Sequence, residues 1–400
     1  MIPTYEEALK IVEGNPNFYE KKEKLPSGVD VSIFGHRLAT YTDFYKDGEE
    51  TSALELRGIS YVHGEDPEIV PALKKFFNLN QTPGSMLEDF EGVRITRVQE
   101  KLDGSLINFI YDPILSKFKA KSKMTMYSDQ ALMADEILER DRNLRRFLKD
   151  CHHNNFGMPL YPTFELVSPF NKIVLDYPKT ELRLIQLRRW DGSYIDFSTE
   201  GWSDYLYNMG IKFNHEYPVT FDLDYLMKSA ESETDREGWV VTFENGKMVK
   251  IKTKWYFELH RLVTENLVAE NGIIELVLNE TFDDVISQIP MGDNRRVYAE
   301  DIANAFTRWY NDNLDEVFQL KREFVYNGLS RKDFALRHKS HPMFGVVMAS
   351  LNDDDAEKFM KEFLLKRFRK LSVAKSFVEN TLNISKNVLT NEDEDVNISI

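Results

Sequence analysis

The 400-residue sequence contains a single cysteine, Cys151, so no disulfide can form within the chain and a cysteine-based metal cluster is disfavoured. It also has no apolar run near the roughly 18 residues that a membrane span needs. The N-terminal residues 1–7 have neither the basic start nor the apolar stretch of a signal peptide. We therefore expect a protein of a reducing cytoplasm (the host cytoplasm if the chain is viral) without a membrane partner.

The sequence also lacks the glycine-rich loops that usually hold nucleotide phosphates. Neither G-x-x-x-x-G-K-[ST] nor G-x-G-x-x-G occurs in it. If the protein uses ATP, lysine and arginine side chains must hold the phosphates, together with a metal ion. Basic residues on strands are therefore the first candidates for a nucleotide site.

Positive charge is in the minority, with 51 Lys and Arg against 66 Asp and Glu and a formal net charge of −15. A protein that coats nucleic acid presents broad basic surfaces, so this charge argues against that class. It does not argue against a nucleic-acid enzyme with a local basic channel. Two C-terminal segments, 321–341 and 358–375, are locally basic.

The pattern of the chain changes near residue 260. Before it, short alternating runs broken by Asp-Gly or Asn-Gly turns predict strands, including hairpins over 182–197 and 239–252. Helices are predicted near 5–13 and 129–150. After it, apolar residues at three- and four-residue steps predict helices. One such stripe consists of Phe359, Met360, Phe363, Leu364, Phe368 and Leu371.

These patterns predict an α+β fold. We expect a domain of antiparallel sheets with flanking helices over residues 1–260, and an all-helical domain over 261–378. The polar, acidic segment 379–400 is predicted to be disordered.

The best candidate for a nucleotide site is the run from Glu100 to Ser105, in which Gly104 follows Lys101 by three residues. A lysine held at the start of a strand, with a glycine three residues on, allows the backbone to approach a nucleotide closely. By itself the pattern is weak, since K-x-D-G arises by chance in about one 400-residue chain in ten. A solvated lysine before an Asp-Gly turn explains it as well.

The predicted hairpin over 239–252 adds a second group of charges. A two-residue turn at Asn245-Gly246 would pair Trp239 with Lys252. Strand alternation then places Lys250 and Lys252 on one face, and Glu237 on the same face. A solvated hairpin with a charge pair explains this arrangement equally well.

Three further residues stand out by their surroundings. Glu165 is the one carboxylate in the apolar strand 163–167, either at an edge or placed in a site. Arg57 and Lys75 are cations in short apolar runs. Each alone is more often structural than functional.

In their order, these runs resemble those of the bacteriophage RNA ligase 1 family, within the superfamily of covalent nucleotidyltransferases. That superfamily includes DNA ligases and mRNA capping enzymes. The similar runs lie within residues 30–260 and are Arg57-Gly58, Lys75 to Asn80, Lys101 to Ser105, Lys121 to Lys123, Ser128 to Ala134, Phe164 to Pro169, Asn171 to Leu175, Glu237-Gly238, Lys250 to Lys252 and Trp255-Tyr256.

The resemblance implies a role for each matching residue. Lys101 is the implied nucleophile that becomes linked to AMP, and the other implied catalytic residues are Glu165, Glu237 and Lys123. The implied ATP-binding residues are His36, Arg57, Lys75, Lys101, Glu165, Lys250 and Lys252. For Mg²⁺ the resemblance implies Glu237 and Asp283. The chain departs from the family at His36, where a tyrosine is usual, and at Met124, where a glycine is usual.

The implied activity is ATP-dependent RNA ligation in three steps. Lysine takes AMP from ATP, AMP moves to the 5′-phosphate of RNA, and a 3′-hydroxyl then displaces AMP. The implied partner is RNA with these two ends, such as a nicked tRNA, and the enzyme is expected to act as a monomer. We also hypothesise that the basic segments 321–341 and 358–375 contact RNA phosphates. The alternatives are another covalent nucleotidyltransferase (a DNA ligase or a capping enzyme) and a catalytically idle RNA-binding or assembly factor.

Overall fold

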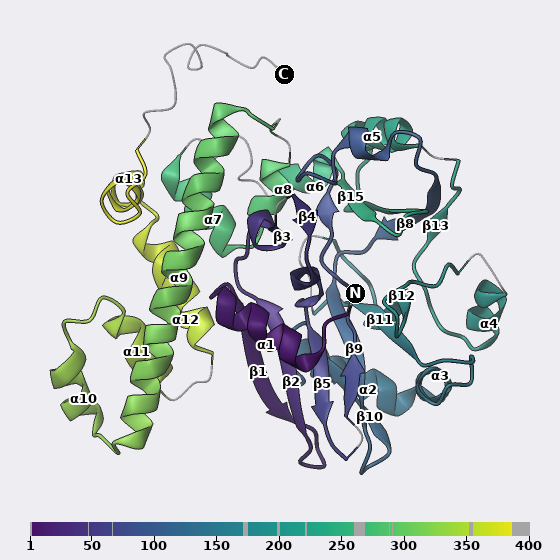
Figure 1. Cartoon of the computed structure of the whole chain (residues 1–400), viewed down its shortest axis with the longest axis horizontal. Helices are drawn as coiled ribbons and strands as arrows, with labels where there is room; N and C mark the ends of the chain where they lie inside the picture. The colour runs from purple at the N-terminus through teal and green to yellow at the C-terminus, as the bar shows by residue number, and fades with distance from the viewer. Residues whose placement is uncertain are drawn as a thin grey trace. The chain divides into compact units, whose positions relative to one another are not determined.

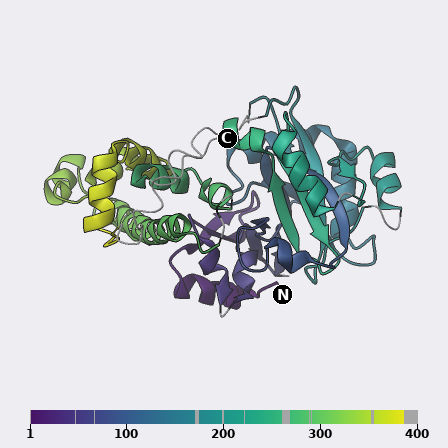
Figure 2. The same cartoon turned by 90° about the horizontal axis from the view of Figure 1, so that it is seen from above.

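The computed structural model describes residues 2–385 except 47, 66, 171–174, 198–200, 221, 260–268, 288, 290 and 352–354. The chain divides into two units, one of Met1–His36 and Tyr41–Arg261, the other of Arg37–Thr40 and Leu262–Ile400. The first consists of antiparallel sheets with flanking helices and the second is helical, which confirms the predicted α+β class (Figure 1 and Figure 2). Among the residues described, none of the helices has both the length and the apolar character that a membrane crossing requires.

Three sheets of four or five strands build the first unit. Their strand orders are β1-β2-β5-β6, β10-β9-β11-β12 and β13-β8-β14-β15-β7, and all their pairs are antiparallel except β15 with β7. The strands are β1 (Phe18–Lys24), β2 (Asp30–His36), β5 (Ile59–His63), β6 (Glu68–Val70), β7 (Phe77–Asn78), β8 (Ile95–Lys101), β9 (Ser105–Asp112), β10 (Lys117–Lys121), β11 (Leu160–Val167), β12 (Glu181–Arg189), β13 (Glu216–Tyr217), β14 (Gly238–Phe243) and β15 (Met248–Lys252). A small ribbon joins β3 (Tyr45–Lys46) and β4 (Glu49–Glu50).

Helices cover one face of the β10-β9-β11-β12 sheet and one face of the β13-β8-β14-β15-β7 sheet, and they leave the other faces for a site. The helices of this unit are α1 (Tyr5–Gly14), α2 (Asp129–Arg140), α3 (Arg142–His152), α4 (Trp202–Asn208), α5 (Leu223–Ser232) and α6 (Lys254–Leu259), with 3-10 turns at Tyr41–Asp43, Ser52–Glu55 and Leu87–Phe90. Phe164 and Leu166 of β11 pack against α2, α3 and α4, so Glu165 between them points to the opposite face. Val249 and Ile251 of β15 pack against α5, which leaves Lys250 and Lys252 on the other side.

The predicted helix over 129–150 is two helices that meet at Asp141. Its carboxylate accepts hydrogen bonds from the backbone N–H groups of Asn143 and Leu144, which caps α3 and ends α2. The predicted hairpin over 182–197 is only partly formed. Its first arm is β12, but its return arm makes only an isolated bridge, Arg188 with Tyr194.

The predicted register of the hairpin over 239–252 is wrong by one residue. Trp239 pairs with Ile251 rather than Lys252, and Gly238 pairs with Lys252. The reason is the turn, which contains three residues because Gly246 adopts a left-handed φ of +75°. The shift leaves Lys250 and Lys252 on one face, since both lie on β15 two residues apart.

The second unit is a helical bundle around α9. Its helices are α7 (Glu270–Leu278), α8 (Phe282–Ile286), α9 (Asn294–Tyr326), α10 (Arg331–His338), α11 (Phe344–Ser350), α12 (Ala356–Arg367) and α13 (Leu371–Asn380). The stripe predicted over 359–371 spans two helices. Met360, Leu364 and Phe368 are buried, whereas Leu371 begins α13 and is exposed.

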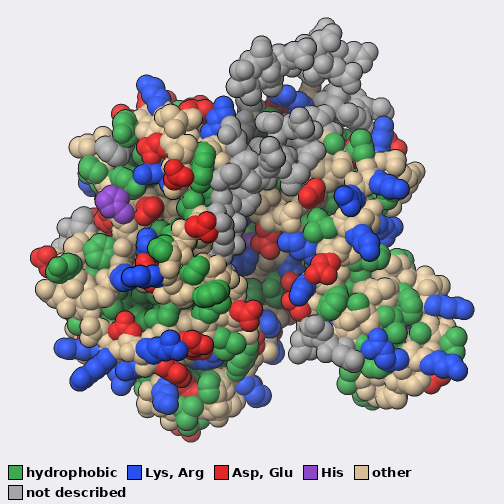
Figure 3. Space-filling model, turned by 180° about the vertical axis from the view of Figure 1, so that it is seen from behind, with side chains coloured by type: hydrophobic (Ala, Val, Ile, Leu, Met, Phe, Trp, Pro, Cys, Tyr) green, Lys and Arg blue, Asp and Glu red, His purple; other side chains and the backbone are tan. Residues whose placement is uncertain are grey.

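The first residues of the segment 379–400, which was predicted to be disordered, are ordered. Residues 379 and 380 end α13, and Leu382 and Ile384 pack against the bundle core, which the acidic composition of the segment concealed. Residues 386–400 lie outside the described part. On the face shown in Figure 3, Lys and Arg are interspersed with Asp and Glu.

Candidate active site

A cavity of about 470 Å³ in the first unit is lined by residues of the β10-β9-β11-β12 and β13-β8-β14-β15-β7 sheets and of neighbouring loops. It brings together six of the residues predicted from the sequence, namely Arg57, Lys101, Lys123, Glu165, Glu237 and Lys250. His36, Lys75 and Lys252 are not among its lining residues. Asp283 belongs to α8 of the second unit.

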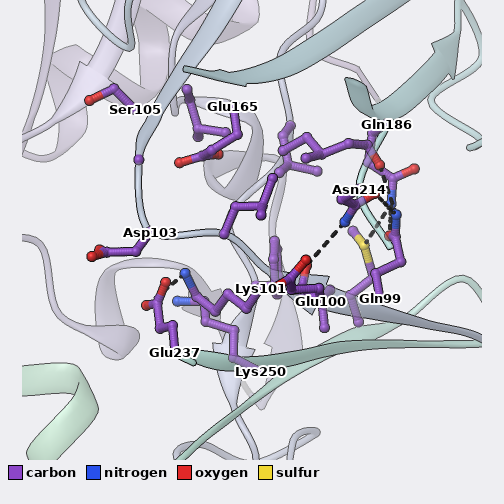
Figure 4. Close-up of a pocket in the computed structure, with 18 of the residues that line it drawn as sticks. Gln99, Glu100, Lys101, Asp103, Ser105, Glu165, Gln186, Asn214, Glu237 and Lys250 are labelled. Carbon is purple, nitrogen blue, oxygen red and sulfur yellow. Dashed lines mark hydrogen bonds and ion pairs between the residues drawn. The ribbon is translucent and has the colours of Figure 1, made fainter. Parts of the chain in front are cut away.

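Lys101, the last residue of β8, is held by Glu237. The Nζ atom of Lys101 lies 2.8 Å from Glu237 Oε1 (Figure 4). The Nζ atom of Lys252 lies 3.0 Å from the same oxygen. Burial alone would raise the pKa of Glu237, but the two ammonium groups outweigh it and lower the pKa below its ordinary value. Glu237 is therefore a buried carboxylate that positions the candidate nucleophile.

Gly238 allows Glu237 to face these lysines. Glu237 and Gly238 would point to opposite faces in a regular strand, but Gly238 has a φ of +147° and starts β14. A Cβ there would lie 2.0 Å from the carbonyl oxygen of Ile251. The sequence predicted Glu237 on the same face as Lys250 and Lys252 from a register that is wrong by one residue, and Glu237 does contact Lys252.

The residues after Lys101 are fixed by tertiary contacts. Asp103 accepts hydrogen bonds from the Tyr256 hydroxyl (3.0 Å) and from the Leu175 N–H (2.7 Å). Gly104 lies against β11, where a Cβ would approach the Leu166 carbonyl oxygen to 2.4 Å. In the K-x-D-G run, the lysine thus faces the cavity while the aspartate and glycine hold its loop in place.

Glu165 lies on β11 at the same cavity and is almost fully buried. Burial raises its pKa from 4.5 to about 8, with Lys101 acting in the opposite direction. Near neutral pH the side chain is therefore largely protonated in the absence of ligand, and it can donate a hydrogen bond as well as accept one.

The raised pKa of Glu165 predicts a pH-dependent stability. The folded state holds a proton that the unfolded state releases, so the free energy of unfolding should fall as pH rises from 4.5 to about 8. The slope contributed is at most about 1.4 kcal/mol per pH unit. In Glu165→Gln this contribution should be absent. Urea unfolding of the nucleotide-free protein across that range, with the exposed Glu91→Gln as control, checks this; an unchanged slope in Glu165→Gln would contradict it.

His36, the last residue of β2, is close enough to three cations to be affected by their charges. Burial lowers the pKa of His36 well below its usual range, and the charges of Lys123, Lys75 and Arg57 lower it further. Its Nε2 atom is buried without a hydrogen-bond partner among the described residues. A neutral imidazole among three cations is a suitable environment for the phosphates of a nucleotide. His36, Arg57 and Lys75 are predicted ATP-binding residues, and Lys123 is a predicted catalytic residue.

Lys121 has a structural role that the sequence did not indicate. It is buried, and its Nζ donates to the carbonyl oxygens of Gly58 (2.8 Å), Ser122 (3.1 Å) and Lys123 (3.2 Å). Burial lowers its pKa to about 7. Because Gly58 and Lys123 are thereby tied together, Arg57 and Lys123 are presented to the cavity from adjoining loops.

Another part of the cavity wall is uncharged. Ile185, Val240 and Met248 line it together with the amides of Gln99, Gln186 and Asn214. These residues come from distant segments and form no local motif, so sequence reasoning missed them.

Comparison with known proteins assigns the chain to a family. A family model described as RNA ligase matches residues 55–259, more than half of the chain and including the cavity residues from Arg57 to Lys250. The chain belongs to this RNA ligase family. This confirms the resemblance found in the sequence, and it disfavours the DNA ligase and capping-enzyme alternatives.

Individual relatives are more distant. The chain is 26% identical over 293 residues to a protein of Thermovibrio ammonificans named "Putative RNA ligase", and the match covers 72% of each. Among solved structures, an archaeal ATP-dependent RNA ligase is 12% identical with a TM-score of 0.45, covering 78% of each chain. An RNA ligase of Naegleria gruberi is 15% identical with a TM-score of 0.37, covering 48% of this chain and 58% of that one. Both TM-scores lie below 0.5, so the assignment of this RNA ligase rests on the family match.

Proposed function

We propose that this RNA ligase uses ATP to form a covalent lysyl-AMP at Lys101, and then joins a 5′-phosphate to a 3′-hydroxyl of RNA, forming a phosphoric ester bond. The observation that carries the proposal is the position of Lys101. It lies in a cavity that offers cations for a triphosphate and an uncharged wall for a base. The buried Glu237 holds its amine at that place.

The first step requires Lys101 to lose its proton. Its Nζ would attack the α-phosphorus, forming an N–P bond while the bond to the departing pyrophosphate breaks. Its Nζ lies 2.8 Å from Glu237 Oε1, so the approach of ATP must weaken that ion pair before the amine can attack. Arg57 and Lys75 would hold the β- and γ-phosphates, and Lys250 and Lys123 would stabilise negative charge as it develops.

The acidic residues of the cavity fit a metal ion that binds with the nucleotide. Glu237 Oε2 is buried without a hydrogen-bond partner among the described residues, and Glu165 is close enough to feel its charge. Mg²⁺ usually takes one or two carboxylates and completes its shell with phosphates and water. Such an ion would neutralise phosphate charge. Asp283 stays a separate proposal for a metal residue, on α8 of the second unit.

We place the reaction in the cytoplasm and assign it to a monomer that repairs RNA, with a nicked tRNA as one natural substrate. A sealing assay tests the acceptor specificity directly. The protein, ATP and Mg²⁺ should join RNA with a 5′-phosphate and a 3′-hydroxyl, and should not join RNA with a 5′-hydroxyl or a 3′-phosphate. Equal sealing of the corresponding DNA would contradict the RNA specificity, and label on the protein without any sealing would favour a different acceptor.

The basic segment 358–375 is proposed to contact RNA phosphates. Four of its cations, Lys366, Arg367, Arg369 and Lys370, are exposed on or just after α12. Changing all four to glutamine should weaken RNA binding about 10-fold or more at low salt and reduce its salt dependence, with AMP attachment unchanged. Electrophoretic binding titrations at several salt concentrations measure both.

A matched control removes as many cations elsewhere. Lys22, Lys24, Arg140 and Arg146 are exposed in the first unit, and their replacement should change RNA affinity much less. Equal losses in the two quadruple variants would indicate a general charge effect and would remove the 358–375 segment as a binding site.

A further inference from the structure

A chain of side-chain hydrogen bonds runs along the uncharged wall of the cavity (Figure 4). Arg97 Nη1 donates to Gln186 Oε1 at 3.0 Å, and Gln186 Nε2 donates to Gln99 Oε1 at 3.5 Å. Gln99 Nε2 then donates to Asn214 Oδ1 at 2.7 Å, and Asn214 Nδ2 donates to the Glu100 carbonyl at 3.0 Å. Arg97, Gln99, Gln186 and Asn214 are all buried.

The ends of this chain determine the orientation of every amide in it. Arg97 can only donate, so Gln186 must turn its oxygen toward it and its NH₂ group toward Gln99. At the other end, the carbonyls of Glu100 and Ile185 can only accept. Gln99 Nε2 donates to the Ile185 carbonyl at 3.2 Å, which independently requires the same orientation of Gln99.

As a result, Gln99 can offer only an acceptor to a ligand. Both of its N–H bonds are used, by Asn214 and by the Ile185 carbonyl, while Oε1 has one contact and a second lone pair. Gln99 precedes Lys101 by two residues on β8, so both side chains point to the cavity face of the sheet. Val240 and Met248 supply apolar surface for a flat ring beside it.

We propose that Gln99 selects adenine over guanine through the exocyclic amino group of the base, an inference that rests on the proposed function. An acceptor beside position 6 of the purine ring fits the amino group of adenine and repels the carbonyl oxygen of guanine. Arg97 anchors the arrangement through its ion pair with Glu216 and its position 4.0 Å from the Phe197 ring centroid. The last hydrogen bond, from Asn214 to the Glu100 carbonyl, connects base recognition to the backbone beside Lys101.

The test compares three nucleotides labelled on the α-phosphate: ATP, GTP and the triphosphate of unsubstituted purine riboside, which lacks the amino group. The measured quantity is the second-order rate of protein labelling. For the wild type, loss of the amino group should reduce the rate about 5- to 10-fold, and GTP should be slower than ATP by about 100-fold or more. Equal rates with ATP and the purine riboside triphosphate would overturn the proposal.

Gln99→Met removes the acceptor while keeping the length of the side chain. In this variant ATP should lose its advantage, so that ATP and the purine riboside triphosphate label the protein at equal rates. A residual preference for ATP as large as that of the wild type would show that Gln99 only supports the wall. If Gln99→Met does not fold, equal wild-type rates with ATP and the purine riboside triphosphate would still overturn the proposal. Absence of label with all three nucleotides would instead contradict the proposed function, whereas equal labelling by all three contradicts only recognition by Gln99.

Discussion

Lys101→Arg is expected to abolish covalent attachment of AMP while leaving the protein folded. Arginine keeps the positive charge that pairs with Glu237 at the end of β8, so the buried carboxylate does not lose its partner. The guanidinium group stays protonated at any pH that the fold tolerates and therefore cannot act as a nucleophile. Labelling with ATP should fall below a few per cent of wild type, and the melting temperature should stay within about 3 °C.

A second readout separates nucleophilic loss from general damage in this variant. RNA that already carries AMP on its 5′-phosphate bypasses lysine adenylylation, and Lys101→Arg should still seal it to a measurable extent. Attachment of AMP to Lys101→Arg above a few per cent would contradict the assignment of Lys101 as the nucleophile.

Gly104→Ala is expected to reduce AMP attachment by about 100-fold or more, although the change adds one methyl group. A Cβ at Gly104 would lie 2.4 Å from the Leu166 carbonyl oxygen and 3.0 Å from Glu165 Cγ. The backbone of β11 cannot give way without disturbing the sheet, so the loop after Lys101 must move instead. That movement would displace Lys101 from Glu237. The labelling rate and the melting temperature of the variant measure the effect.

Gly14→Ala is the matched control for Gly104→Ala. Gly14 ends α1, and no atom lies within 4 Å of a Cβ added there. This variant should label at the wild-type rate, since alanine at an unstrained position is neutral or mildly stabilising. A wild-type rate in Gly104→Ala would show that the contact with β11 does not position Lys101.

Local sequence signals were sufficient for the residues whose position depends on their own strand. Glu165 lies in the otherwise apolar run of β11, on the face opposite Phe164 and Leu166, and Lys101 lies in a short K-x-D-G run that was predicted to start a strand but ends β8. Both signals are visible in a few neighbouring residues. The register of the hairpin over 239–252 was predicted wrongly, because Asn-Gly favours a two-residue turn and no neighbouring residue indicates a three-residue turn.

Residues held by contacts between distant segments could not be found in this way. Asp103 depends on Tyr256, which lies 153 positions further along the chain. Gln99 depends on Asn214, 115 positions away. Lys121 was passed over as a site residue because lysine is rarely buried, and its three carbonyl partners come together only in the folded chain.

The roles proposed for the individual site residues all assume that Lys101 is the nucleophile. The most direct measurement incubates the nucleotide-free protein with Mg²⁺ and ATP labelled on the α-phosphate, separates the products on a denaturing gel, and maps the labelled peptide. We expect one labelled band that is absent in Lys101→Ala, with AMP on the peptide that contains Lys101. No label on a folded, nucleotide-free sample, or label on a different lysine, would contradict it.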